Sequence, residues 1–216
     1  LLRPGTRGNA AWLEDLDAIA AGLGMLRDAG VIVLWRPLHE MNVADFWWGA
    51  APIEDYVRLW RHMHRYFRRD KGLDNLLWVY SPNANPWGGP HILPADAYYP
   101  GPEYVDVVGL DYYADDFARI GPAGYTALVR LGKPFGLTEC GPELGLSQFT
   151  SHDLGKVVEG IRRHAPLATF WWHWHSWGLS KMALVDHAGA KAALAHPWVV
   201  NRDDVDIPAG GSPCSR

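Results

Sequence analysis

The fold of this chain is decided by residues 31–49, which read VIVLWRPLHEMNVADFWWG. The stretch opens with five apolar residues (31–35), and such a run is typical of a strand buried on both faces of a parallel sheet. His39 and Glu40 follow the strand, and three aromatic residues follow at 46–48. A carboxylate at the end of an interior strand is costly unless it is paired or does chemistry. The stretch therefore predicts a buried strand whose carboxyl end carries a functional glutamate.

Composition and charge argue against several classes of protein. The 216 residues include 20 Lys and Arg and 24 Asp and Glu, for a formal net charge of −4. No basic run is dense enough to indicate a nucleic-acid partner, no apolar run approaches the length of a membrane span, and no secretion leader is visible. The 12 Trp, against 6 Phe, favour either a heavy core or a cleft that stacks flat rings such as sugars.

Helices alternate with short apolar strands along the chain. Such alternation predicts a parallel sheet with helical crossovers. No Gly-rich phosphate-binding fingerprint follows any strand, which argues against a nucleotide-binding doubly wound sheet. Polar or aromatic residues end every strand, as in a (β/α)₈ barrel. The expected strands cover residues 31–35, 76–80, 105–110, 134–137 and 169–174, and the expected helices cover residues 9–30, 53–69, 124–131, 153–164 and 188–195.

A full (β/α)₈ barrel usually takes about 250 residues, and only five strands are visible here. We therefore expect a partial barrel of the α/β class that holds about strands 4–8, in one domain over residues 1–206. Residues 207–216, rich in Gly, Ser and Pro, are expected to form a linker or disordered tail. Without three N-terminal strands, a barrel exposes two unpaired edges and one open side of its core. We expect the isolated chain to fold poorly and to show little activity.

Two of the expected strands end in a glutamate, at Glu40 and Glu139. If the strand before Glu40 is the fourth of a barrel, the strand before Glu139 is the seventh, and the two face each other. Two carboxyl groups held about 5–5.5 Å apart define a retaining glycosidase, with one acid/base and one nucleophile. The alternative is a buried ion pair for each glutamate, for example Glu40 with Arg36. Matching strand ends beside aromatic loops favour the catalytic interpretation.

Several motifs resemble those of glycoside hydrolase family 26, the β-mannanase family of the large retaining (β/α)₈ clan. Residues 36–42 (RPLHEMN), followed by residues 46–49 (FWWG), are similar to the acid/base motif of that family. Residues 134–139 (PFGLTE) resemble its nucleophile strand, residues 108–113 (VGLDYY) its sixth strand, and residues 196–203 (HPWVVNRD) its closing segment. The order and spacing of these motifs argue against chance agreement.

The resemblance implies a role for individual residues. Glu40 would be the catalytic acid/base and Glu139 the catalytic nucleophile. Tyr113 would donate a hydrogen bond to Glu139, and Trp174 would be the platform under the sugar at the cleavage point. The full set of implied substrate-binding residues is His39, Trp48, Asp111, Tyr113 and Trp174, with Trp48 also open to a packing role, and the loop after the second expected strand adds Asn85, Trp87 and His91 as candidates.

The chain departs from the pattern of the family in two places. Residues 43–45 (VAD) lack an aromatic residue that the family commonly carries near Asp45, and His175-Ser176 stand where the family often has Arg-Asn. Both departures touch substrate specificity rather than the catalytic pair.

The sequence thus predicts a retaining endo-β-1,4-mannanase that hydrolyses mannan-type polysaccharides with two glutamates. The alternatives are a β-1,3-xylanase or mixed-linkage β-glucanase of the same family, or a non-catalytic carbohydrate-binding protein. No metal or cofactor is expected, because His173 and His175 alone do not make a zinc site. Cys140 and Cys214 do not predict a disulfide. From the resemblance we expect a secreted monomer that binds polysaccharide, with no nucleic-acid or membrane partner.

Overall fold

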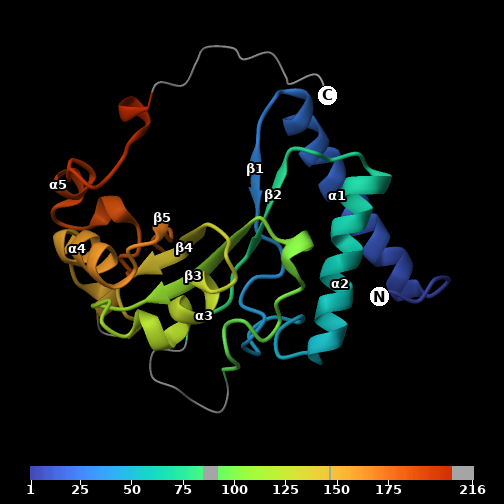
Figure 1. The fold of residues 1–216 in the computed structure, drawn as a ribbon, viewed down its shortest axis with the longest axis horizontal. Coiled ribbons are helices and arrows are strands. Elements are labelled where there is room, and N and C mark those ends of the chain that lie inside the picture. Colours follow the sequence, from blue (N-terminus) through green and yellow to red (C-terminus); the bar gives the residue numbers. More distant parts are fainter. Residues whose placement is uncertain (85–91, 146, 206–216) are drawn as a thin grey trace.

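A five-stranded parallel sheet forms the centre of the chain, and its strands follow one another in the order β1-β2-β3-β4-β5. The computed structural model describes residues 1–84, 92–145 and 147–205. The strands turn progressively from β1 to β5, with α1 and α2 beside the first two and α3, α4 and α5 around the others (Figure 1). A doubly wound sheet would reverse its strand order, whereas sequential order is that of a barrel. The predicted partial (β/α)₈ barrel is therefore confirmed.

The elements agree in number and order with those expected, and their ends differ by a few residues. The strands are β1 Val33–Trp35, β2 Leu76–Tyr80, β3 Val107–Tyr113, β4 Phe135–Gly141 and β5 Ala168–His173; the α-helices are α1 Arg7–Asp28, α2 Ile53–Arg65, α3 Thr126–Val129, α4 Leu154–His164 and α5 Ala190–Leu194. Helix α1 begins two residues before the expected range, because the side chain of Thr6 caps it by accepting a hydrogen bond from the Asn9 amide.

The prediction that the first strand is buried on both faces is wrong. Strand β1 spans only Val33–Trp35, and Ile32 and Leu34 are 65% and 51% exposed. The reason is position: β1 pairs with β2 and is the edge strand of the sheet that the described residues form. Apolar residues that would be interior in a closed barrel therefore stay exposed here.

Strands β3 and β4 run further than predicted and carry functional side chains within them. Asp111 lies in register with Glu139, after a register shift between Leu110 and Asp111. Gly109 permits this close pairing, since a Cβ at that position would stand 2.3 Å from Cγ2 of Thr138. The central strands thus place two carboxylates side by side at the carboxyl edge of the sheet.

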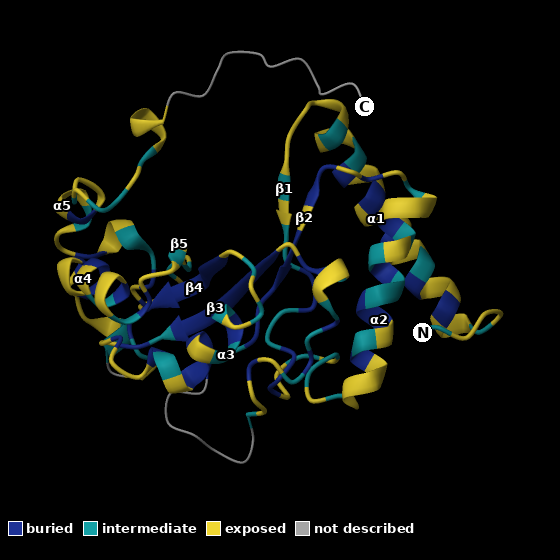
Figure 2. Cartoon of the chain, viewed as in Figure 1, coloured by how far each residue is buried: buried dark blue, intermediate teal, exposed yellow. Residues whose placement is uncertain are grey.

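The core lies between the sheet and the apolar faces of the helices, where the burial colours are darkest (Figure 2). Helix α2 contributes Trp60, whose ring packs edge-on at 5.8 Å from Trp78 of β2. Helix α4 starts after Asp153, whose side chain accepts hydrogen bonds from the amides of Gly155 and Lys156. Cys140 is a buried free thiol, and Cys214 lies outside the described residues. Within the described part of the chain, no helix is both long and apolar enough to cross a membrane.

Candidate active site

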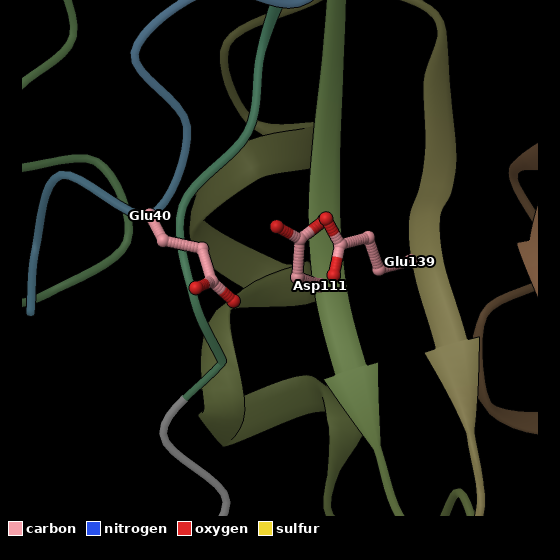
Figure 3. A group of neighbouring side chains, drawn as sticks. All are labelled: Glu40, Asp111 and Glu139. Carbon is pink, nitrogen blue, oxygen red and sulfur yellow. The ribbon is translucent and has the colours of Figure 1, made fainter. Parts of the chain in front are cut away.

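Three carboxylates meet at the carboxyl edge of the sheet. Glu40 lies in the loop after β1, Asp111 on β3 and Glu139 on β4, and Glu40 points toward the other two (Figure 3). Each residue brings one carboxylate oxygen to the cluster, and these three oxygens all lie within 4.8 Å of one another. Three acidic groups this close repel one another unless cations or protons compensate for their charge.

Arg36, directly after β1, supplies the compensating charge. Its Nη1 donates to Oδ2 of Asp111 at 3.0 Å, and its Nη2 donates to Oε1 of Glu139 at 2.5 Å. Although burial opposes its charge, the carboxylates of Asp111 and Glu139 raise the pKa of Arg36. Arg36 thus pairs with the residues of β3 and β4, and not with Glu40, the partner considered from the sequence.

Asp111 lies buried beneath the site. It is 1% exposed. Its Oδ1 accepts hydrogen bonds from the hydroxyls of Ser81 at 2.9 Å and Thr138 at 2.7 Å, while Arg36 occupies Oδ2. Burial raises the pKa of the Asp111 carboxyl, against the effect of Arg36. Both oxygens of Asp111 are thus occupied by protein donors.

Glu139 is held by a donor at each carboxylate oxygen. Arg36 occupies Oε1, and the Tyr113 hydroxyl donates to Oε2 at 2.7 Å. Burial, with the nearby charge of Glu139, raises the pKa of Tyr113, so this phenol stays protonated and remains a donor. Two fixed donors therefore orient the carboxylate.

The carboxylate of Glu40 has a different environment from that of Glu139, although the two lie close together. It is half-buried, and its Oε1 accepts a hydrogen bond from Nδ2 of Asn83 at 2.6 Å. Burial raises the pKa of Glu40 to about 7, the nearby Glu139 adds to the rise, and Asn83 opposes it. A carboxyl group with this pKa can both give and take a proton near neutral pH.

His39 and the aromatic residues that follow form the wall next to Glu40. The Nε2 of His39 lies 3.9 Å from Oε1 of Glu139, and its ring lies 4.7 Å from that of Phe46. Burial and the charge of Arg36 lower the pKa of His39, which keeps the ring neutral at pH 7. Trp48 donates its Nε1–H to the carbonyl of His39 at 2.7 Å and stacks on Phe46 at 4.7 Å. The structure therefore uses Trp48 to brace the loop that carries His39 and Glu40.

Trp174 follows β5 and is half-buried. Its backbone N–H donates to the carbonyl of Cys140 at 3.1 Å, and its side chain lines a cavity of about 290 Å³ together with Arg36 and Thr138. Trp174 thus lies on the same side of the sheet as the carboxylates. Trp172 lines the same cavity and is 65% exposed, because β5 is the other edge strand of the described sheet.

Four residues of the site were not recognised as such from the sequence: Arg36 as a partner of Glu139, Ser81, Asn83 and Thr138. Ser81 and Asn83 directly follow β2, as Glu40 follows β1, and this shared position at a strand end was the available signal. Their partners depend on the pairing of neighbouring strands, which the sequence does not display. The candidates Asn85, Trp87 and His91 lie outside the described residues.

The sheet and the position of the site together define an α/β protein of the (β/α)₈ type. A sequentially ordered parallel sheet with crossover helices carries a pair of glutamates at the carboxyl ends of its strands, which is where (β/α)₈ proteins build their sites.

The chain belongs to glycosyl hydrolase family 26, whose sequence model matches residues 3–204. It is 36% identical over 203 residues to mannan endo-1,4-beta-mannosidase A and B of Caldalkalibacillus mannanilyticus, covering 90% of this chain and 37% of that protein. It is also 36% identical over 199 residues to a mannan endo-1,4-beta-mannosidase of Bacillus subtilis, covering 88% of this chain and 51% of that protein.

A solved structure of a Bacillus subtilis mannanase superposes with a TM-score of 0.83 at 32% sequence identity, over 100% of this chain and 61% of that one. The chain therefore spans between 37% and 61% of the length of these three relatives.

Proposed function

We propose that this chain is part of a retaining endo-β-1,4-mannanase that hydrolyses mannan-type polysaccharides. The observation that supports the mechanism is the proximity of Glu40 and Glu139. One carboxylate oxygen of Glu40 lies within 4.8 Å of one carboxylate oxygen of Glu139. Retaining glycosidases hold their carboxyl groups about 5–5.5 Å apart, whereas inverting enzymes leave about 6.5–9.5 Å for a water molecule. The substrate is proposed from the two curated relatives, both named mannan endo-1,4-beta-mannosidases.

In the proposed reaction, the ionised carboxylate of Glu139 attacks the anomeric carbon while Glu40 gives its proton to the leaving glycosidic oxygen. A covalent glycosyl ester on Glu139 results. Glu40, now ionised, removes a proton from a water molecule that attacks the same carbon and releases the sugar. The two donors on Glu139 suit a nucleophile that must stay ionised. The desolvated position of Glu40 suits an acid that must start protonated.

The other predicted residues would act on the bound sugar. Trp174 offers a flat ring for stacking beside the carboxylates, and the neutral ring of His39 offers a hydrogen bond to a hydroxyl near Glu139. Trp48 would contribute by holding the His39 loop in place.

The decisive experiment replaces each glutamate in the full-length gene product and assays mannan, xylan and lichenan side by side. Glu139→Ala and Glu40→Ala are both expected to lower mannan hydrolysis by several orders of magnitude, while sugar binding is retained. Hydrolysis of xylan or lichenan but not mannan would overturn the substrate assignment. Binding of mannan without hydrolysis by the unaltered protein would identify a carbohydrate-binding protein instead.

Secretion and a monomeric state remain proposals that follow from the family resemblance. Fractionation of an expressing culture and sedimentation of the purified protein test them, and a cell-retained or dimeric product would contradict the respective proposal.

A further inference from the structure

Asn83, which follows β2 and was given no role by any motif, contacts the catalytic side chain most directly. Its Nδ2 donates to Oε1 of Glu40 at 2.6 Å. Among the described residues, Asn83 is the one that donates a hydrogen bond to the Glu40 carboxylate. Glu139, in contrast, has both oxygens occupied. Asn83 therefore decides how the two oxygens of Glu40 differ.

A second asparagine holds Asn83 in place. The Oδ1 of Asn42 accepts a hydrogen bond from the Asn83 amide N–H at 2.8 Å. The Nδ2 of Asn42 donates to the carbonyl of Asn83 at 2.8 Å and to that of Leu93 at 3.0 Å. Asn42 is 1% exposed and follows Glu40 by two positions. This reciprocal pair ties the loop after β1 to the loop after β2.

The other side of Asn83 is fixed by β3. Asn83 forms an isolated parallel bridge with Asp111. The amide of Ala84 donates to the carbonyl of Asp111 at 3.0 Å, and the amide of Asp111 donates to the carbonyl of Pro82 at 3.1 Å. Since its backbone is held from both neighbouring elements, Asn83 presents its side-chain amide to Glu40 in one defined direction.

We propose that Asn83 is a positioning residue for Glu40: its amide reserves Oε1 as an acceptor, so Oε2 carries the transferable proton, and it supports the ionised form that accepts a proton in the second step. Asn42 acts one step further back, by fixing the backbone of Asn83. This inference rests on the proposed acid/base role of Glu40.

The physical reason lies in the opposed effects on Glu40. Burial favours the neutral carboxyl, whereas a hydrogen bond donated to the carboxylate favours the charged one. An acid that must also serve as a base works best when both forms are accessible near the working pH. Asn83 opposes the effect of burial on the pKa of Glu40, and its loss removes the donor that stabilises the charged form.

The test is Asn83→Ala in the full-length gene product, with two readouts. The first is the ¹³C carboxyl titration of Glu40, assigned by its loss in Glu40→Gln. The second is the alkaline limb of kcat/KM. Because a hydrogen bond to a charged group contributes about ten- to a hundredfold to an equilibrium, both are expected to rise by about one to two pH units. With an aryl mannoside whose leaving group needs no proton, kcat is expected to fall about tenfold or more, since the second step then limits the rate.

Asn75→Ala is the matched control. Asn75 is also a buried asparagine, but its amide donates to the carbonyls of Leu23 and Val31 near the start of β2. The Asn75→Ala variant is expected to be less stable, but the titration of Glu40 and the alkaline limb of kcat/KM are expected to stay unchanged. Asn42→Ala is expected to move both in the same direction as Asn83→Ala, but less.

An isosteric second variant keeps the proposal testable if Asn83→Ala folds poorly. Asn83→Asp preserves the backbone hydrogen bonds with Asn42 and replaces the donor with a like charge, so the titration of Glu40 should move upward further still. If neither variant moves the titration, Asn83 has no positioning role. Because the titration requires no turnover, a protein that fails to hydrolyse mannan would overturn the proposed function but would still report on Asn83.

Discussion

Single side chains decide how the two proposed catalytic glutamates differ. Arg36 and Tyr113 each donate to one oxygen of Glu139, while Glu40 sits in a desolvated place with the amide of Asn83 at Oε1. The neighbouring side chains therefore distinguish the two roles proposed for the same residue type.

Arg36 is expected to be the residue whose loss is most damaging to stability. Arg36→Met would leave Asp111 and Glu139 buried without their shared cation. Removal of one partner from a buried ion pair costs about 3–5 kcal/mol, and we expect a loss of that order in the free energy of unfolding measured with urea. Arg36→Lys should be only partly better, because an ammonium group cannot reproduce the two-pronged contact of a guanidinium.

The exposed Arg69→Met on the turn after α2 is the control, and its effect is expected to stay within about 0.5 kcal/mol. A similar, small effect for both substitutions would contradict the importance assigned to Arg36.

The pH dependence of hydrolysis should report the pKa of Glu40. Burial raises this pKa from 4.5 to about 7, so the carboxyl group is protonated below that pH and ionised above it. Because bond cleavage needs the protonated acid, kcat/KM is expected to fall as the pH rises through about 7. The measurement is a pH profile with a natural polysaccharide, whose leaving group requires a proton. A profile that is flat from pH 5 to 9, about two units either side of that pKa, would contradict the assignment.

At the scale of elements, patterns within one segment predicted well, and patterns that depend on a neighbour predicted poorly. The bounds of β2 were expected, because they follow from local sequence. The burial of β1 was not, since an identical apolar run is buried in a central strand and exposed at an edge. The register shift before Asp111 likewise depends on β4.

Two buried histidines, His152 before α4 and His187 before α5, lie beside the half-buried His173 of strand β5. The backbone amide of His152 donates to Nδ1 of His187 at 3.0 Å, and Nδ1 of His173 donates to the carbonyl of Met182 at 3.1 Å. The rings of His152 and His173 lie 5.8 Å and 6.0 Å from that of His187. A proton on Nδ1 of His187 would break the bond from the amide, so this arrangement requires a neutral His187 ring.

We expect the cluster to make stability depend on acid. Burial lowers the pKa of all three rings, that of His173 to about 4. Since these values lie below the ordinary 6.5, the unfolded chain takes up protons first, and stability is lost as the pH falls from about 6.5 toward 4. The charges facing the cluster are those of Asp115, Asp153, Asp186 and Lys181.

The measurement is the urea midpoint between pH 7 and pH 4, a window that spans the pKa of His173. In His173→Phe the midpoint should depend less on pH than in the unaltered protein, while the exposed His175→Phe should leave the dependence unchanged. Equal dependence in all three proteins would show that the cluster does not titrate on unfolding.

At the scale of the whole molecule, the sheet presents apolar side chains at both edge strands. Leu34 of β1 and Trp172 of β5 are 51% and 65% exposed, and both line the cavity that also holds Arg36 and Trp174. Exposed strand edges with apolar side chains invite aggregation unless another element covers them.

We therefore propose that the isolated 216-residue chain melts at a low temperature and hydrolyses mannan poorly. An added N-terminal segment of about 90 residues, taken from a family relative, is expected to pair with the edges and restore both properties. Thermal melts and mannan assays with and without the segment test this, and equal behaviour of the two forms would contradict it.

The sequence by itself determined the alternation of helices and strands, the barrel class, and the two glutamates at strand ends, because periodicity and position along a strand are local properties. Only the tertiary structure decided that Arg36 bridges Asp111 and Glu139, that Asp111 lies below the site, and that Asn83 contacts Glu40. These contacts join residues 43 to 103 positions apart. They depend on strand register and side-chain direction, which arise only when neighbouring strands pair. Residues 31–49 therefore predict Glu40 as a functional residue, but they do not predict that Asn83 donates a hydrogen bond to it.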